Sequence, residues 1–364
     1  MAKRIYIAAT RRNEGKTTVS LGLMGALKAA GVKVGFIKPV GQRYVQVGDV
    51  SVDEDAYLMK EVFQLDVPLE DLGPVAVGKG FTAGYIDNPS VMPLWERIRK
   101  AYDGVSKGMD MVVIEGTGHA GVGSVFDLGN ATVAKLLGAK VLLISGGGIG
   151  RPIDELMLNQ ALFEKQGVQI VGAVINKVEE ERLERTRDYV KRGLGRLGME
   201  LLGAIPQRKA LSNATVRQIY QEMEAELISG EEELDNTVEK IVVGAMEPHR
   251  ALDYMTRRTL VITPGDREDM ILAAMSSCAA GTGKAYCVAG ICLTGGIRPH
   301  KTVMRLIRRS SMPVMIVPED TYSAASQISD LVVKIRPSDV KKIRIAEILV
   351  KRYLDIEALL KQID

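Results

Sequence analysis

The sequence predicts an α/β protein: a parallel sheet with helices on both faces, followed by a second, smaller α/β unit. Three observations lead to this fold class. Short runs rich in Val and Ile alternate with helical segments along most of the chain. These runs are continuously apolar, which is typical of parallel strands covered on both faces. The length of 364 residues exceeds one typical hydrophobic core and favours about two domains.

The first unit is expected over residues 1–228. Its predicted strands are Ile5–Ala9, Lys33–Ile37, Met111–Ile114, Lys140–Ser145, Ile170–Ile175 and Glu200–Ile205. Its predicted helices are Lys16–Ala30, Asp55–Phe63, Pro93–Lys107, Asn130–Leu137, Pro152–Gln166, Glu180–Leu197 and Asn213–Glu224. Ligands of such sheets gather beyond the carboxyl ends of the strands, so we expect the chemistry in the loops that follow them.

The polar, acidic segment 229–236 is interpreted as an interdomain linker. The second unit, residues 237–337, has predicted strands at Lys240–Gly244, Thr259–Thr263, Ala285–Leu293 and Pro313–Val317. Residues 338–364 are predicted to form one long amphipathic helix. Its Lys and Arg side chains form a solvated face in one reading, and in the other the helix docks a partner subunit.

Composition excludes several classes of protein. No apolar run approaches the ~18 residues that a membrane helix needs, and the N-terminus lacks the pattern of a secretory signal. Cys278, Cys287 and Cys292 have no disulfide or zinc spacing, so we expect buried thiols in a reducing cytoplasm. A net charge of +3 is too small to indicate nucleic-acid binding. We therefore expect a cytoplasmic protein with neither membrane nor nucleic acid as partner.

The segment from Ala9 to Thr18 has the layout of a phosphate-binding loop: a strand, a Gly-Lys-Thr turn and then a helix. Backbone N–H groups of the turn and the helix N-terminus would wrap the phosphates of a nucleotide. Lys16 would reach the β- and γ-phosphates, and the Thr17 hydroxyl would bind Mg²⁺. The nucleotide contacts expected here are Thr10, Arg11, Asn13, Glu14, Gly15, Lys16, Thr17 and Thr18.

Charged residues at other strand exits complete the predicted site. Glu115 ends an apolar strand, where it holds Mg²⁺ or simply faces solvent, and the glycine loop from Gly116 would admit a ligand closely. Lys38 follows another strand and could pair with a γ-phosphate or a substrate carboxylate. Asp55 opens a helix, so metal contact and N-cap are equally open readings.

Taken together, these residues make the first unit resemble dethiobiotin synthetase and the P-loop NTPase domain of long phosphotransacetylases. The matching motifs are the Ala-Thr-x4-Gly-Lys-Thr loop, Lys38-Pro39-Val40, Asp55, Glu115-Gly116 and Asn176. That family carries threonine where other P-loops have their first glycine, which accounts for Thr10. The resemblance implies ATP and Mg²⁺, with the metal at Thr17, Asp55 and Glu115. It also implies adenine recognition by Asn176, with help from the loop at Pro206.

Two departures limit the resemblance, and two further readings stay open. One departure is that the synthetase's phosphate loop has smaller residues where Arg11, Arg12 and Asn13 stand here; the other is a missing serine. The synthetase has a serine shortly after its Lys-Pro-Val, whereas this chain has Gly41-Gln42-Arg43, which disfavours carboxylation of a biotin precursor. Arg11 stands where related dimeric ATPases carry a lysine that reaches the partner's nucleotide; a merely exposed arginine is the alternative. Asn176 to Glu179 also approximates a guanine-reading motif, with glutamate in place of aspartate, and we favour adenine.

The second unit resembles the DRTGG domain that follows the P-loop domain in long phosphotransacetylases. The resemblance rests on Asp266-Arg267 after one predicted strand and Thr294-Gly295-Gly296 after the next. These residues suit either an anion or nucleotide site or ordinary turns that serve packing and dimerisation. The acetyl-transfer domain of a phosphotransacetylase would need several hundred further residues. None of the three histidines has metal-ligand spacing.

Three functions are therefore weighed. The preferred one is an Mg-ATP-binding regulator with slow or partner-dependent ATPase activity, linked to phosphotransacetylase-type metabolism and dimeric through its second unit. The second is an ATP-dependent carboxylate ligase or carboxylase, in which Lys16 and Lys38 neutralise the transferred phosphoryl group. The third is a binding module that hydrolyses nothing, and in each case the small-molecule partner is open. We find no Ser, His or Cys constellation for covalent catalysis, which disfavours acyl transfer.

Overall fold

The computed structural model describes residues 2–89, 93–279 and 288–363. The chain divides into two compact units, of which the first contains residues 1–211 and 335–364 and the second residues 212–334. The predicted boundary at 228 and the linker at 229–236 are therefore wrong. Strand β11 (Glu226–Ser229) pairs with β15 (Val314–Ile316) inside the second unit, and Leu234 is only 1% exposed. Three consecutive glutamates made this segment look like a solvated linker, although its apolar residue is buried.

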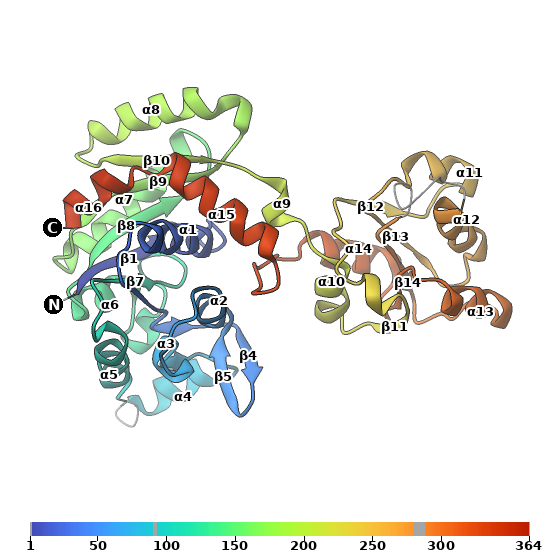
Figure 1. The fold of residues 1–364 in the computed structure, drawn as a ribbon, viewed down its shortest axis with the longest axis horizontal. Helices are drawn as coiled ribbons and strands as arrows, with labels where there is room; N and C mark the ends of the chain where they lie inside the picture. Colours follow the sequence, from blue (N-terminus) through green and yellow to red (C-terminus); the bar gives the residue numbers. More distant parts are fainter. Residues whose placement is uncertain (1, 90–92, 280–287, 364) are drawn as a thin grey trace. The chain divides into compact units, whose positions relative to one another are not determined.

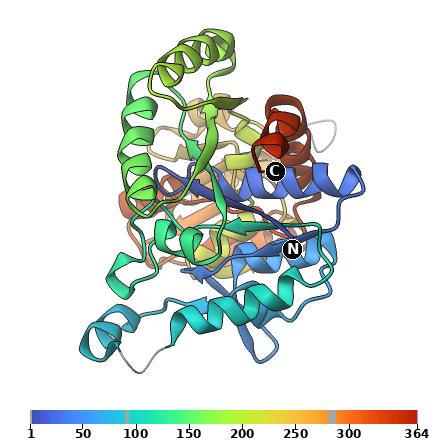
Figure 2. The same cartoon turned by 90° about the vertical axis from the view of Figure 1, so that its left-hand side faces the viewer.

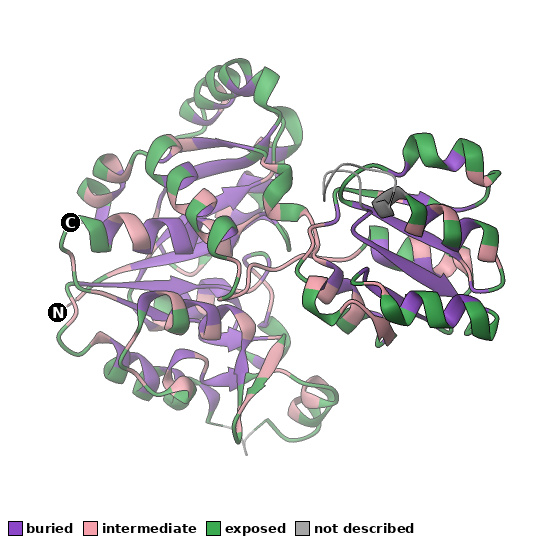
Figure 3. Cartoon of the chain, turned by 45° about the vertical axis from the view of Figure 1, so that its right-hand side comes forward, coloured by how far each residue is buried: buried purple, intermediate pink, exposed green. Residues whose placement is uncertain are grey.

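The first unit contains the predicted parallel sheet of six strands, in the order β10-β9-β8-β1-β7-β2 (Figure 1). The strands are β1 (Lys3–Ala9), β2 (Val34–Ile37), β7 (Met111–Glu115), β8 (Lys140–Ser145), β9 (Ile170–Val178) and β10 (Leu201–Pro206). Most of their residues are buried, so the strands appear as a continuous buried layer in Figure 3. Because β1 lies between β7 and β8, the loop after β1 opens at the centre of the carboxyl edge, where such sheets bind ligands.

Helices cover both faces of this sheet, as predicted. They are α1 (Lys16–Ala29), α2 (Glu54–Phe63), α5 (Leu94–Ser106), α6 (Asn130–Leu136), α7 (Gly150–Lys165) and α8 (Leu183–Gly195). Helices α7 and α8, drawn in green, lie on one face of the sheet, where they pack on strands β8, β9 and β10. Helix α1, drawn in blue, lies on the opposite side together with the red C-terminal helices (Figure 2).

The C-terminal segment completes the face that α1 covers. It forms two helices, α15 (Val340–Tyr353) and α16 (Ile356–Ile363), rather than the one predicted. The break occurs because the Asp355 N–H donates to the Leu202 carbonyl of β10, at 2.8 Å, instead of continuing the helix. Helix α15 packs on α1 and α16 packs on β1, β9 and β10. Lys342 is only 7% exposed, and burial lowers the pKa of its amine, so not all basic residues of this segment are solvated.

The sequence did not predict the small elements between β2 and α5. They are β3 (Val40–Gly41), β4 (Tyr44–Val47), β5 (Val50–Asp53), α3 (Leu69–Leu72), β6 (Val75–Ala76) and α4 (Phe81–Asp87). Strands β4 and β5 form an antiparallel hairpin, which leads directly into α2. The hairpin therefore fixes the position of Asp53 and the residue at which α2 begins.

The second unit has a five-stranded sheet in the order β11-β15-β14-β13-β12, parallel except for β11. Its other strands are β12 (Lys240–Val243), β13 (Thr259–Pro264) and β14 (Gly290–Thr294). Its helices are α10 (Val216–Glu222), α11 (Pro248–Ala251), α12 (Glu268–Ala279), α13 (Lys301–Arg309) and α14 (Thr321–Ser329), and α9 (Lys209–Ser212) lies at the domain boundary. Residues 285–287 of the predicted third strand lie outside the described residues.

The cysteines fall in the second unit. Cys292 is buried in β14, and burial raises the pKa of its thiol to about 12, which suits an inert core residue. Cys287 and the side chain of Cys278 lie outside the described residues. Over the described part of the chain, no helix combines the length and apolar character needed to span a membrane.

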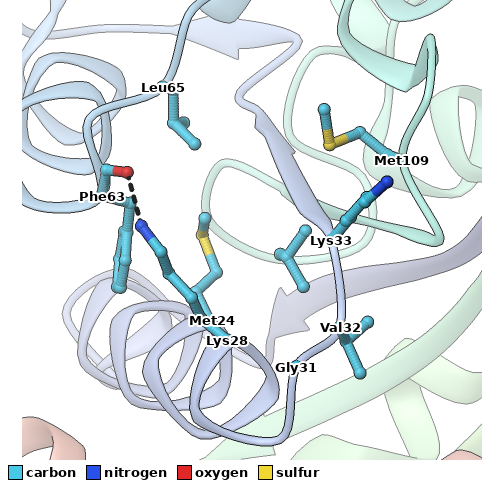
Figure 4. A pocket seen from close by; sticks show the side chains of 9 residues that line it. Met24, Lys28, Gly31, Val32, Lys33, Phe63, Leu65 and Met109 are labelled. Atoms are coloured by element: carbon cyan, nitrogen blue, oxygen red, sulfur yellow. Dashed lines mark hydrogen bonds between the residues drawn. The ribbon is translucent and has the colours of Figure 1, made fainter.

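A pocket of about 340 Å³ lies at the end of the first unit where α1 and α2 finish and β2 begins (Figure 4). Its lining residues are Met24, Lys28, Gly31, Val32, Lys33, Val34, Phe63, Leu65 and Met109. The Lys28 Nζ donates to the Phe63 carbonyl at 2.9 Å, which joins the ends of the two helices. Because α1 starts at the Gly-Lys-Thr turn and ends here, this pocket is separate from the predicted nucleotide site.

Candidate functional site

The predicted phosphate loop is a tight turn at the N-terminus of α1. Gly15 caps the helix with φ of 94°, a left-handed conformation that favours glycine. A Cβ at this position would lie 2.1 Å from the Asn176 Nδ2, so glycine is also required for space. Helix α1 follows directly with Lys16 and Thr17 in its first turn, which directs backbone N–H groups toward the loop.

Thr10 anchors the start of the loop. Its backbone N–H donates to the Ile144 carbonyl of β8 at 2.8 Å. Its hydroxyl lies 3.0 Å from the Ser145 Oγ and donates to the Glu155 Oε2 at 3.0 Å. A glycine could make neither side-chain contact, which gives a physical reason for threonine in this loop.

Asn176 and Lys177, at the end of β9, brace the other side of the loop. The Asn176 Nδ2 donates to the Glu14 carbonyl at 2.8 Å, and the Lys177 Nζ donates to the Asn13 carbonyl. Asn176 is 5% exposed, so this structure places its amide against the loop backbone. Pro206 ends the neighbouring strand β10, in register with Val178. Both residues that the resemblance assigns to adenine therefore lie at or near the carboxyl ends of neighbouring strands.

An acidic residue that the sequence analysis missed, Glu155, forms ion pairs with arginines beside the loop. Glu155 of α7 forms ion pairs with the Arg11 guanidinium at 2.6 Å and with the Arg151 Nε at 2.7 Å. The Arg11 side chain is 55% exposed. Nearby, burial raises the pKa of the Glu14 carboxyl. Glu155 lies far from the loop in sequence, inside an ordinary helical stretch, so no local pattern marks it.

The remaining predicted residues meet in one buried cluster. The Lys38 Nζ lies 3.1 Å from the Asp53 Oδ1 and 3.6 Å from the Glu115 Oε1. It also donates to the Asp55 Oδ2. The Thr17 hydroxyl donates to the Glu115 Oε1 at 3.0 Å, which joins the phosphate loop to the cluster. Lys38, Asp53, Asp55 and Glu115 are each 5% exposed or less.

The electrostatics of this cluster keep the lysine protonated. Burial alone would lower the pKa of Lys38, but the carboxylates of Asp55, Asp53 and Glu115 outweigh it and hold the pKa well above its usual value. The structure tests one of the two readings of Asp55, the N-cap. Asp53 is the N-cap of α2, because its Oδ1 accepts from the Asp55 N–H at 2.9 Å. Asp55 as the N-cap is therefore wrong, and its carboxylate contacts Lys38 instead.

The glycine loop after β7 begins next to Glu115 and packs closely on Asn130 and Tyr6. A Cβ at Gly116 would lie 2.6 Å from the Asn130 Oδ1 and 2.7 Å from the Tyr6 ring. The Asn130 side chain holds the loop by accepting from the Thr117 N–H at 3.0 Å. His119 has a structural role, since its Nδ1 accepts from the Gly121 N–H at 3.2 Å. Asn130 and local hydrogen bonds therefore hold the loop that follows Glu115.

Thr17, Asp55 and Glu115 supply hydroxyl and carboxylate oxygens, the ligand types that Mg²⁺ prefers. Within the described ranges, however, no three His, Cys, Asp or Glu side chains are arranged to hold a metal ion. An ammonium group lies among the carboxylates instead. The donor chemistry fits magnesium, while the present arrangement is that of a lysine–carboxylate cluster.

Residues of the predicted second site make hydrogen bonds within the second unit. The N–H groups of Gly295 and Gly296 donate to the Glu319 and Val317 carbonyls at 2.7 and 2.9 Å, so neither is directed at an anion. The Thr294 hydroxyl lies 2.7 Å from that of Thr321.

Arg267 is held in the same way. It pairs with Asp269 at 2.9 Å and also donates to the Gly244 carbonyl at 3.2 Å. Asp266 precedes it in the turn between β13 and α12. The five predicted residues thus lie at the carboxyl ends of β13 and β14, and Arg267, Thr294, Gly295 and Gly296 make contacts that hold the turns together.

Comparison with known proteins identifies both units. The model of a family described as an AAA domain matches residues 3–215, more than half of the chain. The chain belongs to this family. A model described as a DRTGG domain matches residues 218–331. The predicted order, a P-loop domain followed by a DRTGG domain, is confirmed.

Curated relatives match nearly the whole chain. Phosphate acetyltransferase of Nitratidesulfovibrio vulgaris is 30% identical over 367 residues, which cover 98% of this chain and 51% of the relative. The Synechocystis enzyme of the same name is 28% identical and covers 99% and 52%. The chain thus spans about half the length of the curated relatives it matches.

Solved structures show weaker similarity. The MinC:MinD cell division protein complex of Aquifex aeolicus matches with a TM-score of 0.39 at 19% identity, covering 58% of this chain and 84% of that one. The CBS and DRTGG domains of Clostridium perfringens pyrophosphatase, complexed with diadenosine tetraphosphate, match with a TM-score of 0.27 at 18% identity, covering 39% and 62%.

Proposed function

We propose that the first unit binds Mg-ATP at the loop from Thr10 to Thr18. The observation that carries this proposal is the contact between the loop and the acidic cluster: the Thr17 hydroxyl donates to Glu115 at 3.0 Å, and Glu115 lies 3.6 Å from Lys38. These contacts support a site in which the loop would hold the phosphates and Lys38 and the carboxylates would lie beside them. This combination is what phosphoryl-group recognition requires.

Each residue has a role that follows from its chemistry. Lys16 follows Gly15 at the helix N-terminus and would donate to the β- and γ-phosphates. Thr17, Asp55 and Glu115 would hold Mg²⁺, which when bound neutralises phosphate charge and orients the γ-phosphoryl group. Lys38, at the end of β2, would carry a second positive charge to the γ-phosphate. Asn176 and the loop at Pro206 would face the adenine.

We further propose slow or partner-dependent ATP hydrolysis and a regulatory role linked to phosphotransacetylase-type metabolism. Support comes from relatives named phosphate acetyltransferase, which align with nearly the whole chain over half of their own length. Arg11 lies half-exposed at the rim of the loop, held by Glu155, where a partner subunit could engage it. A cytoplasmic homodimer formed through the second unit completes the proposal.

An ATP-dependent carboxylate ligase remains the second candidate, because Lys38 lies where it could neutralise an acyl phosphate. Gln42 weighs against it. Its Oε1 accepts from the Arg12 guanidinium at 2.8 Å, in the segment where the synthetase has its substrate serine.

The test is a nucleotide titration by calorimetry, followed by phosphate-release assays on the full chain. We expect Mg-ATP to bind more tightly than Mg-GTP, and phosphate release to be slow until a phosphotransacetylase catalytic domain is added. Phosphate release that depends on an added carboxylic acid would favour the ligase. The absence of nucleotide binding would reject both.

A further inference from the structure

One ammonium group occupies the centre of the acidic cluster. The Lys38 Nζ contacts the carboxylates of Asp53, Asp55 and Glu115, and the Thr17 hydroxyl reaches the same Glu115 oxygen. These are the oxygens that the proposed function assigns to the metal, with Asp53 added. A cation already lies among them, but it belongs to the protein.

We propose that Lys38 takes the place of the divalent metal in the nucleotide-free protein, so that the metal enters only with a phosphate that draws Lys38 away. This inference rests on the proposed nucleotide site and concerns the order in which its parts assemble. It also gives Asp53, which is not among the predicted metal ligands, a part in retaining the cation.

The charges favour an exchange over joint occupancy. Mg²⁺ requires oxygen ligands at about 2.0–2.1 Å, and an ammonium at the same oxygens would repel it strongly in a buried site. Counting these four side chains alone, three carboxylates surround one ammonium. Such an acid-rich set suits a divalent cation better than a monovalent one. In this proposal Mg²⁺ is excluded only while the Lys38 ammonium has no other anionic partner.

The Asp53 carboxylate is held in place, whereas the lysine carries its ammonium on a longer side chain. Asp53 caps α2, and a Cβ at Gly41 would lie 2.6 Å from its Oδ2, so this carboxylate is closely packed. The Lys38 backbone N–H is held by the Leu72 carbonyl at 2.8 Å. Its ammonium is carried on a flexible four-carbon stem. A phosphate on the loop, next to Thr17, would offer that ammonium a new partner.

The test measures metal binding without nucleotide. Calorimetric titration of the full chain with Mg²⁺ or Mn²⁺ is compared for the wild type, Lys38→Met and Lys38→Arg. We expect no binding by the wild type or by Lys38→Arg, and an affinity for Lys38→Met that is greater by at least about tenfold. Lys33→Met, at an exposed lysine before β2, is the matched control and should behave like the wild type.

Equal binding of metal by wild type and Lys38→Met, or no binding by either, would overturn the proposal. If Lys38→Met does not fold, the wild type still decides. Its unfolding temperature should not respond to Mg²⁺ unless an ATP analogue is present, and stabilisation by Mg²⁺ alone would refute the exchange. ATP binding in EDTA is measured separately, so failure of the nucleotide site is distinguished from failure of the exchange.

Discussion

Single side chains determine what the phosphate loop can hold. Glycine at position 15 is required twice, by its left-handed conformation and by the Asn176 amide 2.1 Å from a hypothetical Cβ. Thr10 ties the loop to β8 and α7. The Lys38 ammonium gathers three carboxylates, and one of them, Glu115, accepts from the Thr17 hydroxyl. Each of these contacts joins residues that are distant in sequence, so the loop geometry depends on the tertiary structure of the first unit.

Loss of either predicted metal ligand should weaken nucleotide binding only when metal is present. For Thr17→Ala and Glu115→Gln we expect the affinity for Mg-ATP to fall by about 10–100-fold. Affinity for ATP in EDTA should change little, since neither side chain is expected to contact phosphate directly. Calorimetry in the two buffers measures this. An equal loss in EDTA would mean that these residues act on the nucleotide or on the loop.

Glu14 should make stability depend on pH. Burial raises the pKa of its carboxyl, so the folded state binds this proton more tightly than the unfolded chain. The contribution of Glu14 to stability should therefore fall as pH rises from its unfolded pKa, about 4.3, through its folded value. Glu14→Gln should be more stable than the wild type at pH 7, and the difference should vanish in acid. Urea unfolding at pH 4 and 7 measures the free energy of unfolding of both proteins. An increase in the stability of the wild type relative to the variant as the pH rises would contradict this prediction.

At the scale of elements, the sequence predicts most of the first unit well and misses what depends on distant contacts. Strand β8 begins and ends at the predicted residues, because its apolar run is bounded clearly. The β4–β5 hairpin was missed because its strands are only half-buried and therefore lack a strong apolar pattern. The cluster acids Asp55 and Glu115 were predicted as site residues because they lie at the start of a helix and the end of a strand. Asp53 and Glu155 were not, because their roles come from partners remote in sequence.

The packing of α1 on α15 yields a prediction with its own control. Gly22 and Gly25 lie on the same helix, so replacement by alanine has the same favourable effect on helix propensity, roughly 1 kcal/mol. A Cβ at Gly22 would lie 2.4 Å from the Val350 side chain and 2.7 Å from the Ala346 carbonyl. At Gly25 it would meet only the flexible end of Glu347, at 2.8 Å.

We therefore expect Gly22→Ala to lose roughly 1–3 kcal/mol of unfolding free energy through overpacking. Gly25→Ala should be neutral or more stable, since Glu347 can move aside. Chemical denaturation of the full chain compares the two. If both variants show the same stability, α15 does not pack on α1 as closely as this structure has it.

At the scale of the whole molecule, the chain leaves the first unit at residue 211 and re-enters it at 335. No sequence pattern predicts this return, because it depends on which sheet face α15 and α16 cover. Their buried residues Leu349, Val350, Leu354, Leu359 and Ile363 belong to the first core. Limited proteolysis is therefore expected near residues 211 and 335 rather than within 229–236.

Removal of residues 335–364 should unfold the first unit. Burial of five large apolar side chains contributes roughly 8–15 kcal/mol, which equals the whole stability of a typical domain. Residues 1–211 joined to 335–364 by a flexible Gly-Ser linker should fold and bind ATP, because only the second unit is removed. Circular dichroism and calorimetry on the two variants test this. A folded, ATP-binding fragment 1–211 would contradict the assignment of the C-terminal helices to the first core.

The central claim, that the loop from Thr10 to Thr18 binds nucleotide phosphates, is tested most directly by calorimetry with Mg-ATPγS on the wild type and Lys16→Ala. Loss of two charge-assisted hydrogen bonds, roughly 1.5–3 kcal/mol each, predicts an affinity at least about 100-fold lower for the variant. Its circular dichroism should match the wild type, and Lys33→Ala, at an exposed lysine, should bind normally. Equal affinity of Lys16→Ala and the wild type would contradict the account.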